Sequence, residues 1–187
     1  MLDKNLLLVD IGGTNIRYAY SNIGDSDFVS ENKAELDSLN DFDNLMSELL
    51  AEADVKNIVF SVAGPKVNNS IKMTNRNFEI DADEIKKRFN LESCYLLNDW
   101  ESIGYSIRTF AENDFDTFKD GEPFNDTFLV IGPGTGLGAS VISGNNVIAT
   151  EIGNTNLGLS ALKSLLKINS DEFNVLEDVI SGTGISR

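Results

Sequence analysis

Histidine is absent from the 187-residue sequence, and cysteine occurs once. Without histidine there is no Ser-His-Asp triad, no Cys-His pair and no histidine-ligated zinc site. The single cysteine, Cys94, cannot form an internal disulfide. Because nothing basic lies beside it, we expect Cys94 to be a small core residue rather than a nucleophile.

Positive charge and long apolar runs are also scarce. The chain has 15 basic and 30 acidic residues, a formal net charge of -15, and such a surface repels nucleic acid and anionic lipid alike. No apolar run approaches the ~20 residues that cross a bilayer, and Met1–Lys4 leads into a strand pattern without the apolar segment of a signal peptide. We therefore expect a cytoplasmic protein with neither nucleic acid nor membrane as a partner.

The apolar periodicity predicts an α/β protein in which one plan of strand, hairpin and helix begins twice. A polar, turn-rich stretch at 112–125 separates the two halves, so we expect an N-terminal α/β domain over 1–110 and a second, incomplete one over 111–187. The expected elements are strands 6–10, 16–20, 58–62 and 95–97, helices 37–50 and 81–89, a weaker helix 100–110, strands 128–131, 139–142 and 147–150, and helix 157–168.

Two glycine-threonine turns follow apolar strands, at residues 10–15 (Asp-Ile-Gly-Gly-Thr-Asn) and 132–138 (Gly-Pro-Gly-Thr-Gly-Leu-Gly). Glycine lets backbone N–H groups face an anion, so the two turns predict a polyphosphate site. Neither turn contains lysine or arginine, and a divalent cation, magnesium first, is the natural neutraliser. With the acidic Asp99 at the end of another apolar run, the set predicts a nucleotide-dependent kinase.

Residues 134–139 also fit the dinucleotide pattern G-x-G-x-x-G/A, with Glu151 as the acidic ribose ligand. That fingerprint requires the turn to open a helix, whereas this turn opens a hairpin, so we do not favour a nicotinamide site. Taken alone, the second turn is also compatible with an ordinary glycine-rich hairpin.

Six segments, in this order, resemble the bacterial glucokinase family. They are Leu8–Asn15, Ser61–Pro65, Met73–Asn75, Leu97–Asp99, Ile131–Gly138 and Glu177–Gly182. The resemblance implies the actin-like ATPase fold: a ribonuclease-H-like small domain followed by the beginning of a second domain of the same type. It also implies ATP and Mg²⁺ as cofactors and a hexose, with glucose first, as substrate.

The resemblance implies a role for each matching position. Asp99 would be the catalytic base for the sugar 6-hydroxyl, and Asp10 would meet magnesium. The positions that would bind ATP are Asp10, Gly12, Gly13, Thr14, Asn15, Gly134, Thr135 and Gly136. Those that would contact the sugar are Asn75, Asn98, Asp99, Glu151, Asn154 and Glu177.

Each assignment has a purely structural alternative. Asp10 could cap its own turn, Asp99 could cap the following helix, and Asn75 could form a turn. Glu151 and Glu177 could be solvated surface charges.

The sequence departs from the family pattern in two ways. The first is substitution: Asn154 stands where the family has a histidine that touches the sugar, and Phe78, a lesser change, stands where it usually has tryptophan. The second is length, since family members continue well beyond residue 187. We therefore expect these 187 residues alone to bind sugar weakly and turn over ATP poorly, and to expose apolar surface that favours a homodimer.

The resulting hypothesis is an ATP-dependent hexose kinase that forms glucose 6-phosphate for glycolysis. The alternative is a catalytically weak sugar-binding regulatory protein of the same fold, which Asn154 favours and Asp99 opposes. A phosphatase or acid kinase of the same superfamily is less compatible with the Thr74-Asn75 and Asn98-Asp99 pairs, which suit a polyol substrate.

Overall fold

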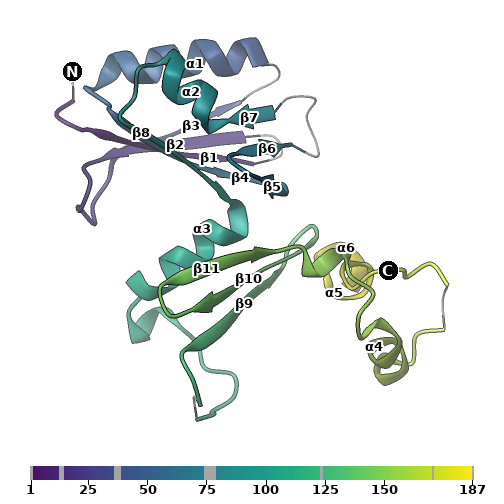
Figure 1. Cartoon of the computed structure of the whole chain (residues 1–187). Helices are drawn as coiled ribbons and strands as arrows, with labels where there is room; N and C mark the ends of the chain where they lie inside the picture. Colours follow the sequence, from purple (N-terminus) through teal and green to yellow (C-terminus); the bar gives the residue numbers. More distant parts are fainter. Residues whose placement is uncertain are drawn as a thin grey trace. The chain divides into compact units, whose positions relative to one another are not determined.

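The structure, a computed structural model, describes residues 2–12, 15–35, 39–73, 79–122, 124–169 and 171–186 (Figure 1). The chain separates into two compact units, Met1–Asp99 and Trp100–Arg187. The first unit ends earlier than the boundary that the sequence predicts after residue 110. The reason is helix α3 (Asp99–Ser106), which packs on the sheet of the second unit through Trp100 and Gly104.

The first unit contains a five-stranded mixed sheet in the order β3-β2-β1-β4-β8. Its strands are β1 (Leu6–Ile11), β2 (Asn15–Ser21), β3 (Val29–Glu35), β4 (Asn57–Val62) and β8 (Ser93–Asn98). β1 pairs antiparallel with β2, and β4 runs parallel to both β1 and β8. The predicted first hairpin and both later strands are confirmed. Because β1, β4 and β8 are parallel, their carboxyl ends lie at one edge of the sheet.

Two helices, α1 (Leu39–Glu52) and α2 (Ala82–Arg88), cover one face of this sheet (Figure 1). Phe42, Met46 and Leu49 repeat along α1 at helical spacing and are buried, and the Phe42 ring lies 6.1 Å from that of Phe60 on β4. The hydroxyl of buried Tyr20 donates to the Leu49 carbonyl at 3.0 Å. The core therefore joins the helical layer directly to the central strands.

A small antiparallel sheet, β5-β6-β7, leads into α2. Its strands are β5 (Lys66–Val67), β6 (Ser70–Lys72) and β7 (Glu79–Asp81). The side chain of Asp81 caps α2 by accepting a hydrogen bond from the Glu84 amide at 2.9 Å. The helix predicted at 81–89 is thus confirmed with its cap.

The second unit is built on the antiparallel sheet β11-β10-β9. Its elements are α3, the 3₁₀ turns η1 (Ile107–Thr109), η2 (Glu112–Asp114) and η3 (Ile152–Asn154), strands β9 (Thr127–Pro133), β10 (Leu137–Ser143) and β11 (Asn146–Thr150), and helices α4 (Leu159–Leu166), α5 (Glu177–Ile180) and α6 (Gly182–Ile185). The predicted second hairpin and the helix at 157–168 are confirmed. Over the described residues, no helix has both the length and the apolarity needed to cross a bilayer.

Cys94 lies in the core of the first unit, as the sequence predicts. Burial, assisted by the carboxylates of Asp83 and Asp81, raises the pKa of its thiol to about 12 from an ordinary value of 9.0. A thiol of this kind is protonated at neutral pH and is a poor nucleophile.

This pKa predicts a pH dependence of stability. Above about pH 9 the unfolded chain loses the Cys94 proton while the folded chain keeps it, so the free energy of unfolding falls as the pH rises from about 9 to 12. The pKa of Tyr20, which burial and a hydrogen bond to Glu52 also raise, acts in the same direction. Urea unfolding at pH 8 and pH 10.5 measures the fall. In Cys94→Ala the fall should be smaller, and an equal fall in both proteins would contradict the assignment.

Candidate functional site

The carboxylate of Asp10 lies at the carboxyl end of β1 and is held from both neighbouring strands. Its Oδ1 accepts a hydrogen bond from Ser61 Oγ of β4 at 3.1 Å, and its Oδ2 lies 3.5 Å from a guanidinium nitrogen of Arg17 on β2. Both residues are the direct strand partners of Asp10 in the sheet register. The Arg17 pair is solvent-exposed and so orients the carboxylate more than it stabilises the fold.

The first glycine turn follows directly. The Gly12 amide donates to the Asn15 carbonyl at 2.9 Å, which closes the turn between β1 and β2. Gly13 and Thr14, two of the predicted ATP-binding residues, lie outside the described residues. The described part of the turn therefore places Gly12 and Asn15 beside the edge that carries Asp10.

Asn98 ends β8 at the same edge of the sheet. Its side chain is 4% exposed, and Nδ2 donates to the Gly64 carbonyl at 2.9 Å. Gly64 has φ +144° and a side chain there would lie 3.0 Å from the Lys72 carbonyl oxygen, so this position requires glycine. Asn98 consequently has a structural role, anchoring the Gly64 loop, besides its predicted contact with sugar.

Asp99 follows Asn98 and is the first residue of α3. It is partly buried. The sheet order puts β4 between β1 and β8, with Ser61 opposite Asp10 and Asn98 opposite Val62. The first unit thus brings Asp10, Asn98 and Asp99 to one sheet edge. Asn75, the other sugar-binding residue predicted in this unit, lies outside the described residues.

The groups that hold these residues were not predicted. Ser61 lies within one of the six motif segments but had no predicted role, and Arg17 was predicted only as a strand residue. A further cation, Lys66 on β5, donates to the Leu96 carbonyl of β8 at 3.2 Å. The two glycine turns contain no lysine or arginine, so the positive charge near this edge comes from Arg17 on β2 and Lys66 on β5.

In the second unit, the turn at Gly134–Gly136 is fixed through its carbonyl oxygens. The Gly182 amide donates to Gly134 O at 2.7 Å, and Thr183 Oγ1 donates to Thr135 O at 3.1 Å. Within the described part of the chain, the amides of Thr135 and Gly136 donate to no acceptor. The carbonyl oxygens of Gly134 and Thr135 therefore hold the turn, while the amides of Thr135 and Gly136 have the arrangement that a phosphate cradle would need.

Glu177, from α5, lies against this turn. Its Oε2 accepts a hydrogen bond from the Leu137 amide at 3.3 Å, and a side chain at Gly136 would lie 2.8 Å from the same oxygen. A side chain at Gly153 would lie 3.1 Å from it and 2.5 Å from the Leu137 carbonyl. Glu177 therefore has partners inside the protein. The structural alternative for this residue, a surface charge surrounded by solvent, does not apply.

Glu151 and Asn154 flank Gly153 and form a pair of their own. Asn154 Nδ2 donates to Glu151 Oε2 at 3.3 Å, and both side chains are exposed. Since Gly153 abuts Glu177, the second unit gathers its three predicted sugar-binding residues around η3. The roles of Gly153, Gly182 and Thr183 were not predicted, because close backbone approach leaves no periodic signal.

The residues suit a magnesium nucleotide. Among the described residues, no group of three or more acidic, cysteine or histidine side chains could hold a metal alone. Magnesium, however, commonly binds through one or two carboxylates together with substrate phosphates. Asp10, oriented by Ser61, fits that donor set.

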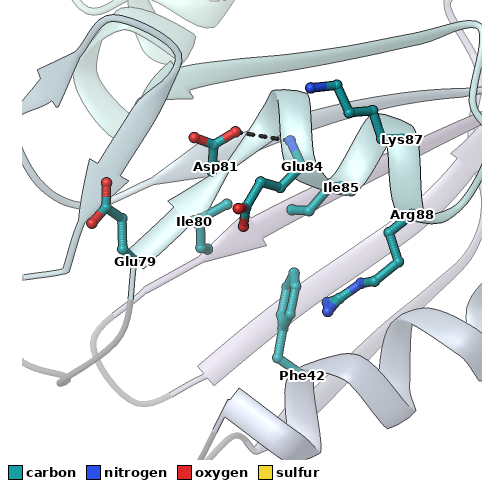
Figure 2. A pocket seen from close by; sticks show the side chains of 8 residues that line it. All are labelled: Phe42, Glu79, Ile80, Asp81, Glu84, Ile85, Lys87 and Arg88. Carbon is teal, nitrogen blue, oxygen red and sulfur yellow. Dashed lines mark hydrogen bonds between the residues drawn. The ribbon is translucent and has the colours of Figure 1, made fainter.

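A pocket of about 580 Å³ lies elsewhere in the first unit, between α1, β7 and α2. Figure 2 shows the apolar side chains of Phe42, Ile80 and Ile85 interspersed with charged side chains. The lining residues are Phe42, Glu79, Ile80, Asp81, Glu84, Ile85, Lys87 and Arg88. None of them is a predicted site residue, and Arg88 is already paired with Asp43. This pocket is separate from the candidate site.

Known proteins resemble this chain in sequence over most of its length. The family model described as glucokinase matches residues 7–187. A glucokinase of Nostoc punctiforme is 30% identical over 197 residues, which cover 96% of this chain and 58% of that protein. The chain therefore spans a little over half the length of this curated relative.

Solved structures show the same fold. A glucokinase from an Antarctic psychrotroph superposes with a TM-score of 0.73 and 26% identity, covering 99% of this chain and 62% of that one. A ROK family glucokinase from Streptomyces griseus, in complex with glucose and AMPPNP, superposes with a TM-score of 0.59 and 20% identity. The match covers 80% of this chain and 50% of that one. With the family match extending over nearly the whole sequence, this chain belongs to the glucokinase family.

Proposed function

We infer that the protein transfers the γ-phosphoryl group of ATP to the 6-hydroxyl of a hexose, with glucose as the first candidate. The observation that carries this inference is the sheet edge where Asp10 and the Asn98-Asp99 pair end parallel strands of one sheet. Relatives named glucokinase, and a structure of one with glucose and AMPPNP, support the choice of substrates.

Phosphoryl transfer depends mainly on in-line placement and charge stabilisation. In our proposal, Asp99 accepts the proton of the hydroxyl as its oxygen attacks the γ-phosphorus. Asp10 would hold magnesium, and the metal would supply positive charge to neutralise the phosphates. The amides of Thr135 and Gly136 bind phosphate oxygens from the second glycine turn.

The sugar-binding part of the proposal rests on hydrogen-bond capacity. Asn98, Glu151, Asn154 and Glu177 combine donors and acceptors, and a buried polar group left unpaired by the wrong sugar costs ~1–3 kcal/mol. Glucose 6-phosphate would enter glycolysis in the cytoplasm. A homodimer remains part of the proposal, since Leu129 and Ile131 of β9 are about half exposed.

The test is a coupled assay with MgATP and four sugars: glucose, mannose, fructose and N-acetylglucosamine. Calorimetry with the same sugars reports binding separately from turnover. We expect saturable phosphorylation of at least one hexose. Sugar binding without any phosphoryl transfer would favour the regulatory alternative instead, and absence of both would refute the proposal.

The regulatory alternative is favoured by one observation, Asn154 in place of the family histidine. Asn154 donates to Glu151 and is shorter than histidine, so its reach toward a sugar is reduced.

Asn154→His tests this departure. One additional hydrogen bond of ~0.5–1.5 kcal/mol corresponds to an affinity for glucose ~2–10-fold higher. Calorimetry of both proteins with glucose measures the change, and Thr155→Ser, at the adjacent position, serves as a control with little effect. Equal or weaker affinity in Asn154→His would show that position 154 does not limit sugar binding.

A further inference from the structure

Helix α3 packs against the sheet of the second unit (Figure 1), and the contacts continue into the turn η1. Trp100, Gly104 and Arg108 are four residues apart and so share one helical face. Gly104 is packed so closely that a side chain there would lie 2.5 Å from Val147 Cγ1 and 2.7 Å from Ser140 Oγ. Arg108 donates to the Gly144 carbonyl and to Asn145 Oδ1 at the opposite end of β10.

Trp100 occupies the other end of this face, beside the second glycine turn. A Cβ atom at Gly132 would lie 1.9 Å from Trp100 Cη2, and one at Gly138 would lie 1.5 Å from Nε1. Gly132 and Gly138 are direct partners in the β9–β10 register. The indole therefore fills the space that two opposed side chains would occupy.

The glycine run at 132–138 thus contains two kinds of glycine. Gly132 and Gly138 make room for the indole, whereas Gly136 makes room for the Glu177 carboxylate. The sequence predicts a phosphate-binding turn at 132–138 with ATP contacts from Gly134, Thr135 and Gly136, and it gives no separate role to Gly132 and Gly138. Only residues 134–136, between the paired strand ends, form the turn itself.

We propose that Trp100 is a positioning residue for nucleotide binding: its indole, seated on Gly132 and Gly138, fixes the strand ends from which the Gly134–Gly136 turn projects. A cross-strand glycine pair lacks side-chain contacts and is intrinsically weak, and an aromatic ring packed over it restores them. A rigid indole with two rotatable bonds suits this task. The proposal rests on the proposed function, because the ligand of the turn is the nucleotide phosphate.

The positioning matters because the turn acts through backbone amides. A displacement of about 1 Å in a group that orients a substrate can cost ~10²-fold. The Gly182 and Thr183 contacts hold the turn from its carbonyl side, and Trp100 holds the strands that lead into and out of it. Loss of the indole should consequently weaken nucleotide binding more than sugar binding.

The packing itself is tested by a double-mutant cycle. Gly138→Ala collides with the indole, so it should lower the unfolding midpoint, but in a Trp100→Ala background the new methyl group has room. We expect the double variant to be more stable than the sum of the single changes predicts, by a coupling that thermal melts resolve. Gly121→Ala, where a Cβ meets nothing within 4 Å, is the matched control and should show no coupling to Trp100. If the stability changes of Gly138→Ala and Trp100→Ala simply added in the double variant, the indole would not pack on Gly138.

The functional role is tested by binding of MgAMPPNP and glucose to the same proteins. Trp100→Ala should raise the Kd for MgAMPPNP about tenfold or more and leave that for glucose nearly unchanged, and Trp100→Phe should restore most of the nucleotide affinity. If Trp100 had a merely structural role, its loss would raise the Kd values for MgAMPPNP and glucose together. That outcome, or no change in either Kd, would overturn the proposal. If Trp100→Ala does not fold, Trp100→Leu supplies the same comparison. Failure of the unaltered protein to bind MgAMPPNP would count against the proposed function, while the melts would still decide the packing.

Discussion

We expect Asp99→Asn to lower kcat by ~10²–10⁴-fold while hexose binding persists. The asparagine keeps the size and one hydrogen-bonding oxygen of the aspartate but cannot accept the proton that leaves the 6-hydroxyl. The loss therefore belongs to the transition state rather than to the bound sugar. Initial rates with saturating MgATP give kcat, and calorimetry with the hexose gives Kd.

The control is Asp83→Asn. Asp83 is an exposed carboxylate in the first turn of α2, so its replacement removes the same charge from a comparable position in the same unit. It should leave kcat unchanged. Equal losses in the two variants would indicate a general effect of charge, and unchanged turnover in Asp99→Asn would remove Asp99 from the role of base.

We expect Phe60→Ala to destabilise the protein by about 3–5 kcal/mol. Phe60 is fully buried on β4, the strand between β1 and β8, and its ring packs against Phe42 of α1. Removing it leaves a cavity beneath the strands that position Asp10 and Asn98. Urea denaturation gives the free energy of unfolding, provided that the transition remains two-state.

A matched aromatic replacement is available on the neighbouring strand. Tyr95 of β8 is 62% exposed and pairs with Val59, one residue before Phe60. Tyr95→Ala should cost well under 1 kcal/mol, since little of its side chain is buried. If Phe60→Ala cost no more than Tyr95→Ala, the helical layer would not depend on this contact.

Local sequence patterns were sufficient for most of the elements. Apolar runs predicted β1 and β4, alternation of apolar residues predicted β2, and the Asp81 cap marked the start of α2. The placement of α3 with the second unit was not predictable in this way. It depends on the Trp100 indole meeting Gly132 and Gly138, a contact between residues distant in sequence that no period reports.

The candidate site, too, has one part that the sequence predicts and another part that it does not. Parallel strands end at one edge, so the approach of Asp10 to the Asn98-Asp99 pair could be expected once the strands were assigned. The contact of Arg17 with Asp10 could have been predicted, because the short connection between β1 and β2 fixes which residues of the two strands lie opposite each other. The contacts of Gly182 and Thr183 with the second turn could not, since they arise from irregular backbone.

The proposed reaction is transfer of a phosphoryl group from ATP to a sugar hydroxyl. Phosphorus NMR of the protein with MgATP and glucose distinguishes this reaction from hydrolysis of ATP, because it resolves hexose 6-phosphate from inorganic phosphate. We predict equal amounts of ADP and hexose 6-phosphate, with formation of both abolished when glucose is omitted. Inorganic phosphate as the phosphorus product, or no consumption of ATP with any hexose, would refute the proposed function.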